Sequence, residues 1–234
     1  MRRYLLVDDN QAFIENLAEI LTDEGAEVAL APTGERALEL AGSQRFDALV
    51  TDMRMPVMTG ARLAHEIRRV DPGLPVVVVT AYTGENDLYA AREEGLLAVL
   101  PKPVPIARLC ELLKRARRDA LVALIEDDEA LADNLSEALR DRGFSAVTAR
   151  SVTETERLGG VRPFVALADL RLPGGNDGAA LECVRAKFPG MPAILVTAYA
   201  HGKWKDYNLR VFEKPFDTAQ LLEEVEVVYQ RSLP

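Results

Sequence analysis

Short apolar runs alternate along the chain with longer segments of helical periodicity. In the first half, the apolar runs fall near residues 4–7, 27–31, 46–51, 75–80 and 97–100. After the first run, Ile14, Leu17, Ala18 and Leu21 have the spacing of one apolar helix face. Continuous apolar strands separated by helices are typical of βαβ units, in which helices cover both faces of a parallel sheet.

The second half repeats this alternation. Its apolar runs fall near residues 121–125, 144–149, 164–168, 192–196 and 209–212. Helices are predicted at 105–118 and 217–230, and the first of these leads almost directly into the next strand. The pattern predicts an α/β chain of two flavodoxin-like, doubly wound, five-stranded parallel-sheet domains in tandem, over residues 1–119 and 120–234.

The same polar side chains end the predicted strands of both halves. The first half has Asp8, Asp9, Asp52, Thr80 and Lys102, and the second half has Glu126, Asp127, Asp169, Thr197 and Lys214. The two copies lie 118 residues apart at Asp8, 117 at Asp52 and Thr80, and 112 at Lys102. An internal duplication explains this spacing. Because the carboxyl ends of parallel strands form the functional edge of such a sheet, each set is expected to converge on one site.

These residue types indicate a site for a phosphoryl group and a cation. Clustered carboxylates repel one another unless a cation lies among them, and an open all-oxygen site suits Mg²⁺. A lysine ammonium and a threonine hydroxyl supply a charge and a donor for phosphoryl oxygens. An aspartate carboxylate can itself act as the nucleophile and form an aspartyl phosphate.

Four motifs, in the same order in both halves, resemble the receiver domains of two-component response regulators, which have the CheY-like fold. The first half has Leu-Val-Asp8-Asp9, Thr51-Asp52-Met-Arg-Met-Pro56, Val-Thr80-Ala81-Tyr82 and Leu-Pro-Lys102-Pro103. The second half has Leu-Ile-Glu126-Asp127-Asp128, Ala-Asp169-Leu-Arg-Leu-Pro173, Val-Thr197-Ala198-Tyr199 and Glu-Lys214-Pro215-Phe216. The resemblance covers essentially the whole chain.

The resemblance implies a role for each of these positions. Asp52 and Asp169 would accept the phosphoryl group. One Mg²⁺ per domain would be held by Asp8, Asp9, Asp52 and the Arg54 carbonyl, and by Glu126, Asp127, Asp169 and the Arg171 carbonyl. Thr80, Lys102, Thr197 and Lys214 would contact the phosphoryl group, and a cis peptide bond would precede Pro103 and Pro215.

The family also tunes dephosphorylation through two further positions in each domain. These are occupied by Arg54 and Tyr82 in the first copy and by Arg171 and Tyr199 in the second. All four side chains are bulky, so we expect slow autodephosphorylation at both sites.

The second copy departs from the first between its threonine and its lysine. Thr80 and Lys102 are 22 residues apart, whereas Thr197 and Lys214 are 17 apart, which predicts a shortened or missing fourth helix. We interpret this divergent segment as a docking face centred on Trp204 and Tyr207. The alternative is a loop that has decayed without acquiring a partner.

Composition narrows the class of function. The net charge is −9, and both halves share it, which argues against direct binding of nucleic acid. No apolar run is long enough to span a membrane, and no signal-peptide core precedes the first strand. The two cysteines, Cys110 and Cys183, lie in different halves within helical patterns, which favours buried, reduced side chains in a reducing cytoplasm over a disulfide.

The leading hypothesis is a cytoplasmic response regulator that is phosphorylated by a histidine kinase or histidine phosphotransfer protein and signals through a downstream protein partner. We expect no enzymatic activity beyond self-phosphorylation and autodephosphorylation. A phosphorelay intermediate or phosphate sink, and a receiver-only fragment of a longer regulator, remain alternatives. A phosphatase of the haloacid dehalogenase type is disfavoured, because Arg54 and Arg171 stand where that class needs a second aspartate.

Overall fold

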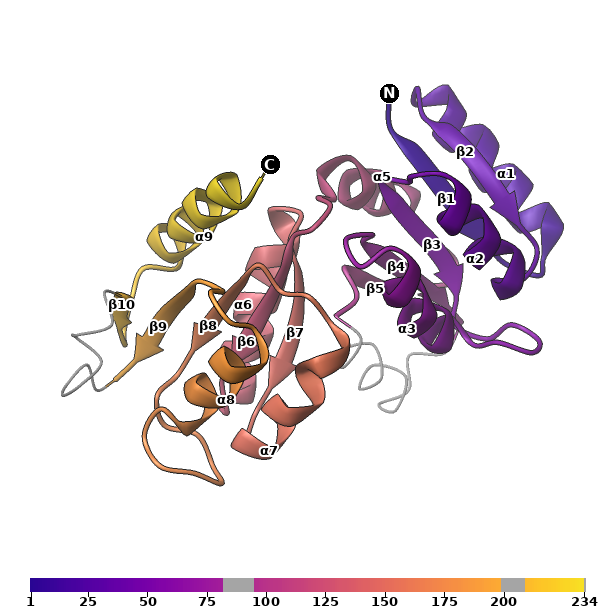
Figure 1. Cartoon of the computed structure of the whole chain (residues 1–234). Helices are drawn as coiled ribbons and strands as arrows, with labels where there is room; N and C mark the ends of the chain where they lie inside the picture. Colours follow the sequence, from indigo (N-terminus) through magenta and orange to yellow (C-terminus); the bar gives the residue numbers. More distant parts are fainter. Residues whose placement is uncertain (82–94, 199–208, 234) are drawn as a thin grey trace. The chain divides into compact units, whose positions relative to one another are not determined.

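The computed structural model describes residues 1–81, 95–198 and 209–233 (Figure 1). Contacts divide the chain into two compact units. The first comprises Met1–Asp119 with Arg140–Ser145, and the second comprises Ala120–Leu139 with Ala146–Pro234. Each unit is built around one five-stranded parallel sheet, so the predicted α/β class is confirmed.

The sheet of the first unit has the order β2-β1-β3-β4-β5. Its strands are β1 (Arg3–Val7), β2 (Glu27–Ala31), β3 (Ala48–Asp52), β4 (Val76–Thr80) and β5 (Ala98–Pro101). Its helices are α1 (Gln11–Asp23), α2 (Gly34–Ser43), α3 (Gly60–Val70) and α5 (Ile106–Arg115). The strand order reverses between β1 and β3, which is where doubly wound sheets place their functional crevice.

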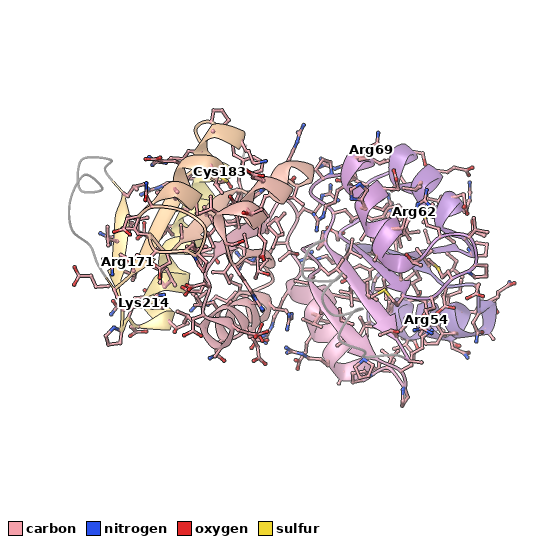
Figure 2. The ribbon with its side chains drawn as sticks, turned by 90° about the horizontal axis from the view of Figure 1, so that it is seen from below. Arg54, Arg62, Arg69, Arg171, Cys183 and Lys214 are labelled. Atoms are coloured by element: carbon pink, nitrogen blue, oxygen red, sulfur yellow. The ribbon has the colours of Figure 1, made fainter. Side chains whose placement is uncertain are left out.

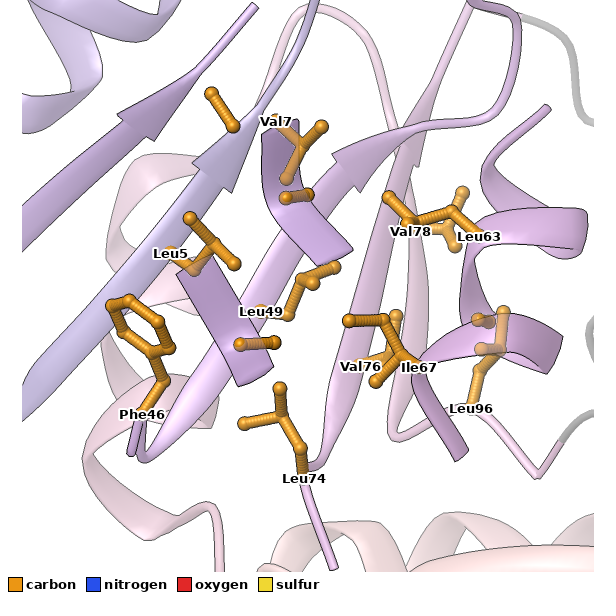
Figure 3. Packing of buried hydrophobic residues seen from close by; sticks show 14 of the residues in the cluster. Leu5, Val7, Phe46, Leu49, Leu63, Ile67, Leu74, Val76, Val78 and Leu96 are labelled. Carbon is orange, nitrogen blue, oxygen red and sulfur yellow. The ribbon is translucent and has the colours of Figure 1, made fainter. Parts of the chain in front are cut away.

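Alternate strand residues pack on the two faces of this sheet. Leu5, Leu49 and Val76 are buried with Leu63 and Ile67 of α3 in one cluster, part of which is shown in Figure 3. The residues that point the other way pack against α1 and α5, through Ile14, Leu17, Leu21, Leu109, Leu112 and Leu113. Helices thus cover both faces of the sheet, so the polar site residues lie at the carboxyl ends of its strands.

The sheet of the second unit has the equivalent order, β7-β6-β8-β9-β10. Its strands are β6 (Leu121–Ile125), β7 (Ser145–Ala149), β8 (Val165–Ala168), β9 (Ala193–Thr197) and β10 (Arg210–Glu213). Its helical segments are α6 (Glu129–Asp141), α7 (Val152–Thr155), the 3₁₀ segment η1 (Glu156–Gly160), α8 (Ala179–Lys187) and α9 (Thr218–Ser232). The ten observed strands begin and end within two residues of the predicted ranges.

Two helical segments are shorter than the repeated sequence pattern predicts. The helix predicted at 105–118 ends at Arg115, because Ala116 leaves the helical conformation with ψ of 132°. Beyond it, the side chain of Arg118 donates to Asp71 Oδ1 at 2.5 Å and to the Phe46 carbonyl. In the second unit, the counterpart of α2 is only the four-residue α7 followed by η1. Two glycines end η1, and glycine is a poor helix former, so the helix does not extend as α2 does.

Candidate functional site: two acidic sites at the sheet edges

In the first unit, the loop after β1 carries Asp8 into the carboxyl edge of the sheet. Asp8 is 2% exposed, and its Oδ1 accepts a hydrogen bond from the Asn10 backbone N–H at 2.8 Å. Asn10 then caps α1 by accepting from the Phe13 N–H at 3.1 Å. Asp9, between them, is exposed to solvent. The start of α1 thus fixes one carboxylate inside the site and leaves the next at its mouth.

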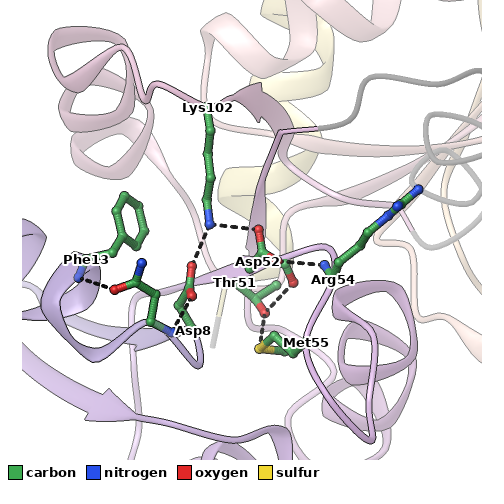
Figure 4. A network of polar contacts seen from close by, with 8 residues as sticks. Asp8, Phe13, Thr51, Asp52, Arg54, Met55 and Lys102 are labelled. Carbon is green, nitrogen blue, oxygen red and sulfur yellow. Dashed lines mark hydrogen bonds and ion pairs between the residues drawn. The ribbon is translucent and has the colours of Figure 1, made fainter.

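Lys102 joins the buried carboxylates of this site. Its Nζ lies 2.7 Å from Asp8 Oδ2 and 2.9 Å from Asp52 Oδ1 (Figure 4). Burial alone lowers the pKa of Lys102, but hydrogen bonds to Asp8 and Asp52 and the charges of both outweigh it, so the pKa is raised. The lysine is therefore a cation that partly neutralises a cluster of acids.

The loop after β3 holds Asp52 at the end of its strand. Asp52 is 8% exposed, and its Oδ2 accepts from the Arg54 backbone N–H at 2.8 Å. Gly60, the first residue of α3, packs so closely that a Cβ there would lie 2.3 Å from the Asp52 carbonyl oxygen. Its N–H donates to the Met53 carbonyl at 2.9 Å. The start of α3 therefore packs directly against the backbone of Asp52, the predicted phosphoacceptor, and fixes its position.

The fourth and fifth strands complete the first site. Thr80 is 1% exposed at the end of β4, and its carbonyl accepts from the Lys102 N–H at 2.7 Å. The Lys102 ammonium also lies 4.6 Å from the centre of the Phe13 ring, a cation–π contact. Sequence reasoning did not find Phe13, although an aromatic residue four positions after Asp9, on the first turn of α1, is its visible signal.

The second unit builds the corresponding site around Lys214. Its Nζ lies 2.9 and 2.7 Å from the two carboxylate oxygens of Glu126, and 2.7 Å from Asp169 Oδ2. Glu126 is 2% exposed and Asp169 is 8% exposed. Asp169 Oδ1 accepts from the Arg171 N–H at 3.1 Å, as Asp52 does from Arg54. Figure 2 labels Lys214 and Arg171 in the second unit and Arg54 in the first.

Glu126 is held less by the backbone than Asp8 is. Its contact with the Asp128 N–H is 3.3 Å long, and its main partner is Lys214. Burial raises the pKa of Glu126, and Lys214 opposes this only in part. The pKa of Lys214 is itself raised, because hydrogen bonds to Asp169 and Glu126 and their charges outweigh the lowering by burial. Thr197 is fully buried, and its carbonyl accepts from the Lys214 N–H at 3.0 Å.

The second site has a donor set suited to a hard divalent cation. One carboxylate oxygen from each of Glu126, Asp127 and Asp169 lies within 4.8 Å of the others, and Asp127 is exposed. Three carboxylates, one of them open to water, match the ligands that Mg²⁺ prefers. In the first unit, Asp8, Asp9 and Asp52 follow the equivalent strands, and among the described residues the close grouping of three carboxylates is found in the second unit.

The structure thus brings together most of the predicted site residues. The peptide bonds before Pro103 and Pro215 are cis, so that prediction is confirmed. Tyr82, Tyr199, Trp204 and Tyr207 lie outside the described residues, as does most of the divergent segment between Thr197 and Lys214. In the described part of the chain, no helix combines the length and apolar character that crossing a membrane requires.

Comparison with known proteins identifies the family. The model of the response regulator receiver domain matches residues 4–114. A response regulator receiver protein of Anaeromyxobacter sp. (strain Fw109-5) is 60% identical over 230 residues, which cover 98% of this chain and 96% of that protein. The response regulator MprA of Mycobacterium ulcerans (strain Agy99) is 34% identical over 168 residues, which cover 72% of this chain and 71% of that protein.

Solved structures are also similar over about half of the chain. A CheY-like response regulator receiver domain protein from Methanospirillum hungatei JF-1 is 30% identical, with a TM-score of 0.47, and the alignment covers 49% of this chain and 91% of that one. Because the sequence matches extend over nearly the full length of a close relative, the chain belongs to the response regulator receiver family of two-component signal transduction.

Proposed function

We propose that the chain is a cytoplasmic response regulator with two receiver domains, each of which accepts a phosphoryl group on aspartate from a histidine phosphoprotein. One observation carries this proposal. In each unit, a single lysine lies between two buried carboxylates at the carboxyl edge of a parallel sheet, with 2.7–2.9 Å contacts. Receiver domains use this combination for phosphoryl transfer, and the second unit repeats the arrangement of the first.

The chain's own residues account for the transfer step. A carboxylate oxygen of Asp52 or Asp169 would attack phosphorus as the bond to the donor histidine nitrogen breaks. The electron pair of that bond stays on the nitrogen, and the imidazole leaves neutral because its other ring nitrogen carries a proton, so the products are an acyl phosphate and a neutral imidazole. The backbone N–H of Arg54 or Arg171 holds the other carboxylate oxygen and orients the nucleophile. The lysine, now paired with that carboxylate, would turn to the incoming phosphoryl oxygens and stabilise their charge.

Three acidic residues in each domain would hold Mg²⁺. Asp8, Asp9 and Asp52 are the ligands proposed in the first, and Glu126, Asp127 and Asp169 in the second. When bound, the ion supplies positive charge to the transferring group. We also propose slow loss of the phosphoryl group at both sites, since Arg54 and Arg171 are exposed, bulky side chains beside the acceptors.

Output would come through a downstream protein, with no enzymatic reaction beyond self-phosphorylation and autodephosphorylation. The net charge of −9 supports a protein partner over nucleic acid. The alternative, a relay that passes phosphoryl groups onward, predicts rapid exchange with a histidine phosphotransfer protein and no partner that distinguishes the phosphorylated state.

The test is the intact mass of the protein after incubation with Mg²⁺ and acetyl phosphate. Wild type should gain two phosphoryl groups, and Asp52→Ala and Asp169→Ala should each gain one. A single group that only Asp52→Ala abolishes would refute phosphorylation of the second domain. No gain in wild type, with or without a histidine phosphodonor, would refute the proposal as a whole.

A further inference from the structure

A small pocket opens at the amino-terminal end of the first sheet, between β1, α1 and α5. It holds about 80 Å³. Its apolar lining comes from Leu21 of α1, Ala26 before β2, and Leu113 of α5. Tyr4, near the start of β1, also lines it, so the pocket lies at the end of that strand opposite Asp8. A closed apolar cavity of about 150 Å³ holds one benzene molecule, so this open pocket can enclose part of a single ring while the rest lies in its mouth.

The hydroxyl of Tyr4 is a polar group that the protein leaves unsatisfied in this pocket. Tyr4 is 3% exposed, and its hydroxyl makes no hydrogen bond to any residue that the structure describes. The oxygen is not sealed from solvent, so it opens into the pocket that Tyr4 lines. Burial raises the pKa of Tyr4 although the charge of Arg2 opposes this, so the hydroxyl keeps its proton at neutral pH. A ligand that accepts this proton in a hydrogen bond would remove the cost of an unpartnered buried donor.

The charged groups at the rim of the pocket are already paired. The Nζ of Lys114 lies 2.5 Å from Glu24 Oε2. Arg2 donates to the backbone carbonyls of Ala116 and Lys114 at 2.8 and 3.0 Å. Its Nη1 also lies 3.7 Å from Asp47 Oδ1. Two cations and two anions leave this rim neutral, so the pocket favours an uncharged ligand over an ion.

The second unit does not repeat the polar groups of this lining. Cys110 of α5 lines the pocket together with Tyr4. At the spacing of 118 residues between β1 and β6, Val122 stands in place of Tyr4. At the spacing of 112 residues between α5 and α9, Leu222 stands in place of Cys110. Both replacements are buried and carry no polar side-chain atom, so a ligand that needs the tyrosine hydroxyl has its site in the first unit.

We propose that the pocket between β1, α1 and α5 binds a small uncharged aromatic molecule with one oxygen substituent, of the phenol type. The oxygen accepts a hydrogen bond from the Tyr4 hydroxyl, and the ring lies against Leu21 and Leu113. Such a site goes beyond the proposed function, because it lies away from the acidic residues and needs neither Mg²⁺ nor a phosphodonor. The half-buried Cys110 thiol in the same lining makes occupancy measurable, since a ligand in the pocket shields it from thiol reagents.

The experiment measures the rate at which iodoacetamide alkylates each cysteine of the full chain, by peptide mass spectrometry, as phenol is titrated. Phenol should slow alkylation of Cys110 saturably and leave Cys183, in the second unit, unchanged. Toluene, which has the same shape without the oxygen, should need about fivefold more for the same protection. Tyr4→Phe keeps the packed ring and should weaken phenol about fivefold without changing toluene. Tyr229→Phe is the matched control, because it removes the hydroxyl of a tyrosine that is 7% exposed in the second unit.

Three results would overturn the proposal. The first is equal slowing of alkylation at Cys110 and Cys183, which would mean that phenol acts on the reagent or on the whole protein. The second is equal protection of Cys110 by phenol and toluene in wild type, which would mean that the Tyr4 hydroxyl does not contact the ligand. The third is the absence of saturable protection of Cys110. The comparison of the two ligands needs no variant, so it decides the question even if Tyr4→Phe fails to fold.

Discussion

The two acidic sites use the same residue types but restrain them differently. In the first, Lys102 divides its contacts between Asp8 and Asp52, and the backbone of Asn10 holds the other oxygen of Asp8. In the second, Glu126 is one methylene longer and gives both of its oxygens to Lys214. The longer side chain thus keeps only a 3.3 Å contact with the Asp128 backbone N–H and places both carboxylate oxygens against Lys214, which ties Glu126 more closely to the lysine.

The surroundings of the two lysines differ as well. Phe13 lies beside the Lys102 ammonium, whereas the equivalent position in the second unit is Leu131. The loops that follow Asp52 and Asp169 differ as well. Val57 has φ of 69° directly after Pro56, and Gly174 has φ of 91° directly after Pro173. The same left-handed backbone is therefore strained in the first unit and relaxed in the second.

The largest expected effect comes from removing the lysines. Lys214→Met should lower the free energy of unfolding of the second unit by about 3 kcal/mol, and Lys102→Met that of the first by about 2 kcal/mol, because buried carboxylates lose their cation. Hydrogen exchange of the β6 and β1 amides would report each unit separately. Lys114→Met, at an exposed pair with Glu24, should change neither. Equal losses at all three lysines would contradict the comparison.

Two glycines at equivalent loop ends, Gly60 and Gly178, should resist a methyl group for different reasons. Gly60→Ala places a Cβ against the Asp52 carbonyl and should cost about 2 kcal/mol and slow phosphorylation of Asp52. Gly178 precedes α8 with φ of 82°, so Gly178→Ala should cost about 1 kcal/mol or more through left-handed backbone strain. Urea unfolding and the intact mass measure the two effects. A normal phosphorylation rate in Gly60→Ala would show that the backbone there adapts.

Exchanging the residues after the two prolines should change stability in opposite directions. Val57→Gly should stabilise the first unit by up to about 1 kcal/mol, because it removes left-handed strain from a side chain that is 90% exposed. Gly174→Val should destabilise the second unit by about the same amount. Thermal unfolding of the two variants decides this, and a loss of stability in Val57→Gly would mean that the valine makes a compensating contact.

The smallest expected effect is a pH dependence in the second unit. Because burial raises the pKa of Glu126 above its ordinary value, the folded unit binds that proton more tightly than the unfolded chain does. The free energy of unfolding should therefore fall as the pH rises from the ordinary glutamate pKa through the raised one. The glutamine of Glu126→Gln does not titrate, so the stability of this variant relative to wild type should increase as the pH rises from the ordinary glutamate pKa through the raised one. Urea unfolding at each pH would measure this difference. A constant difference across the window would rule out this contribution.

The sequence by itself determined the strand pattern, the duplication and the convergence of the acidic residues. Parallel strands bring their carboxyl ends to one edge whatever the details of packing, so Asp8, Asp52 and Lys102 could be placed together from their positions alone. The apolar periodicity likewise located the strands to within two residues, since buried strands must be almost wholly apolar.

Only the tertiary structure decided how those residues meet. Three features depend on loop conformations that the pattern of side chains along the sequence does not encode. They are the number of contacts made by Lys214, the position of the Phe13 ring beside Lys102 and the left-handed backbone of Val57. Periodicity reports which face of an element is buried, whereas contacts between elements depend on distances that are set when the whole domain packs.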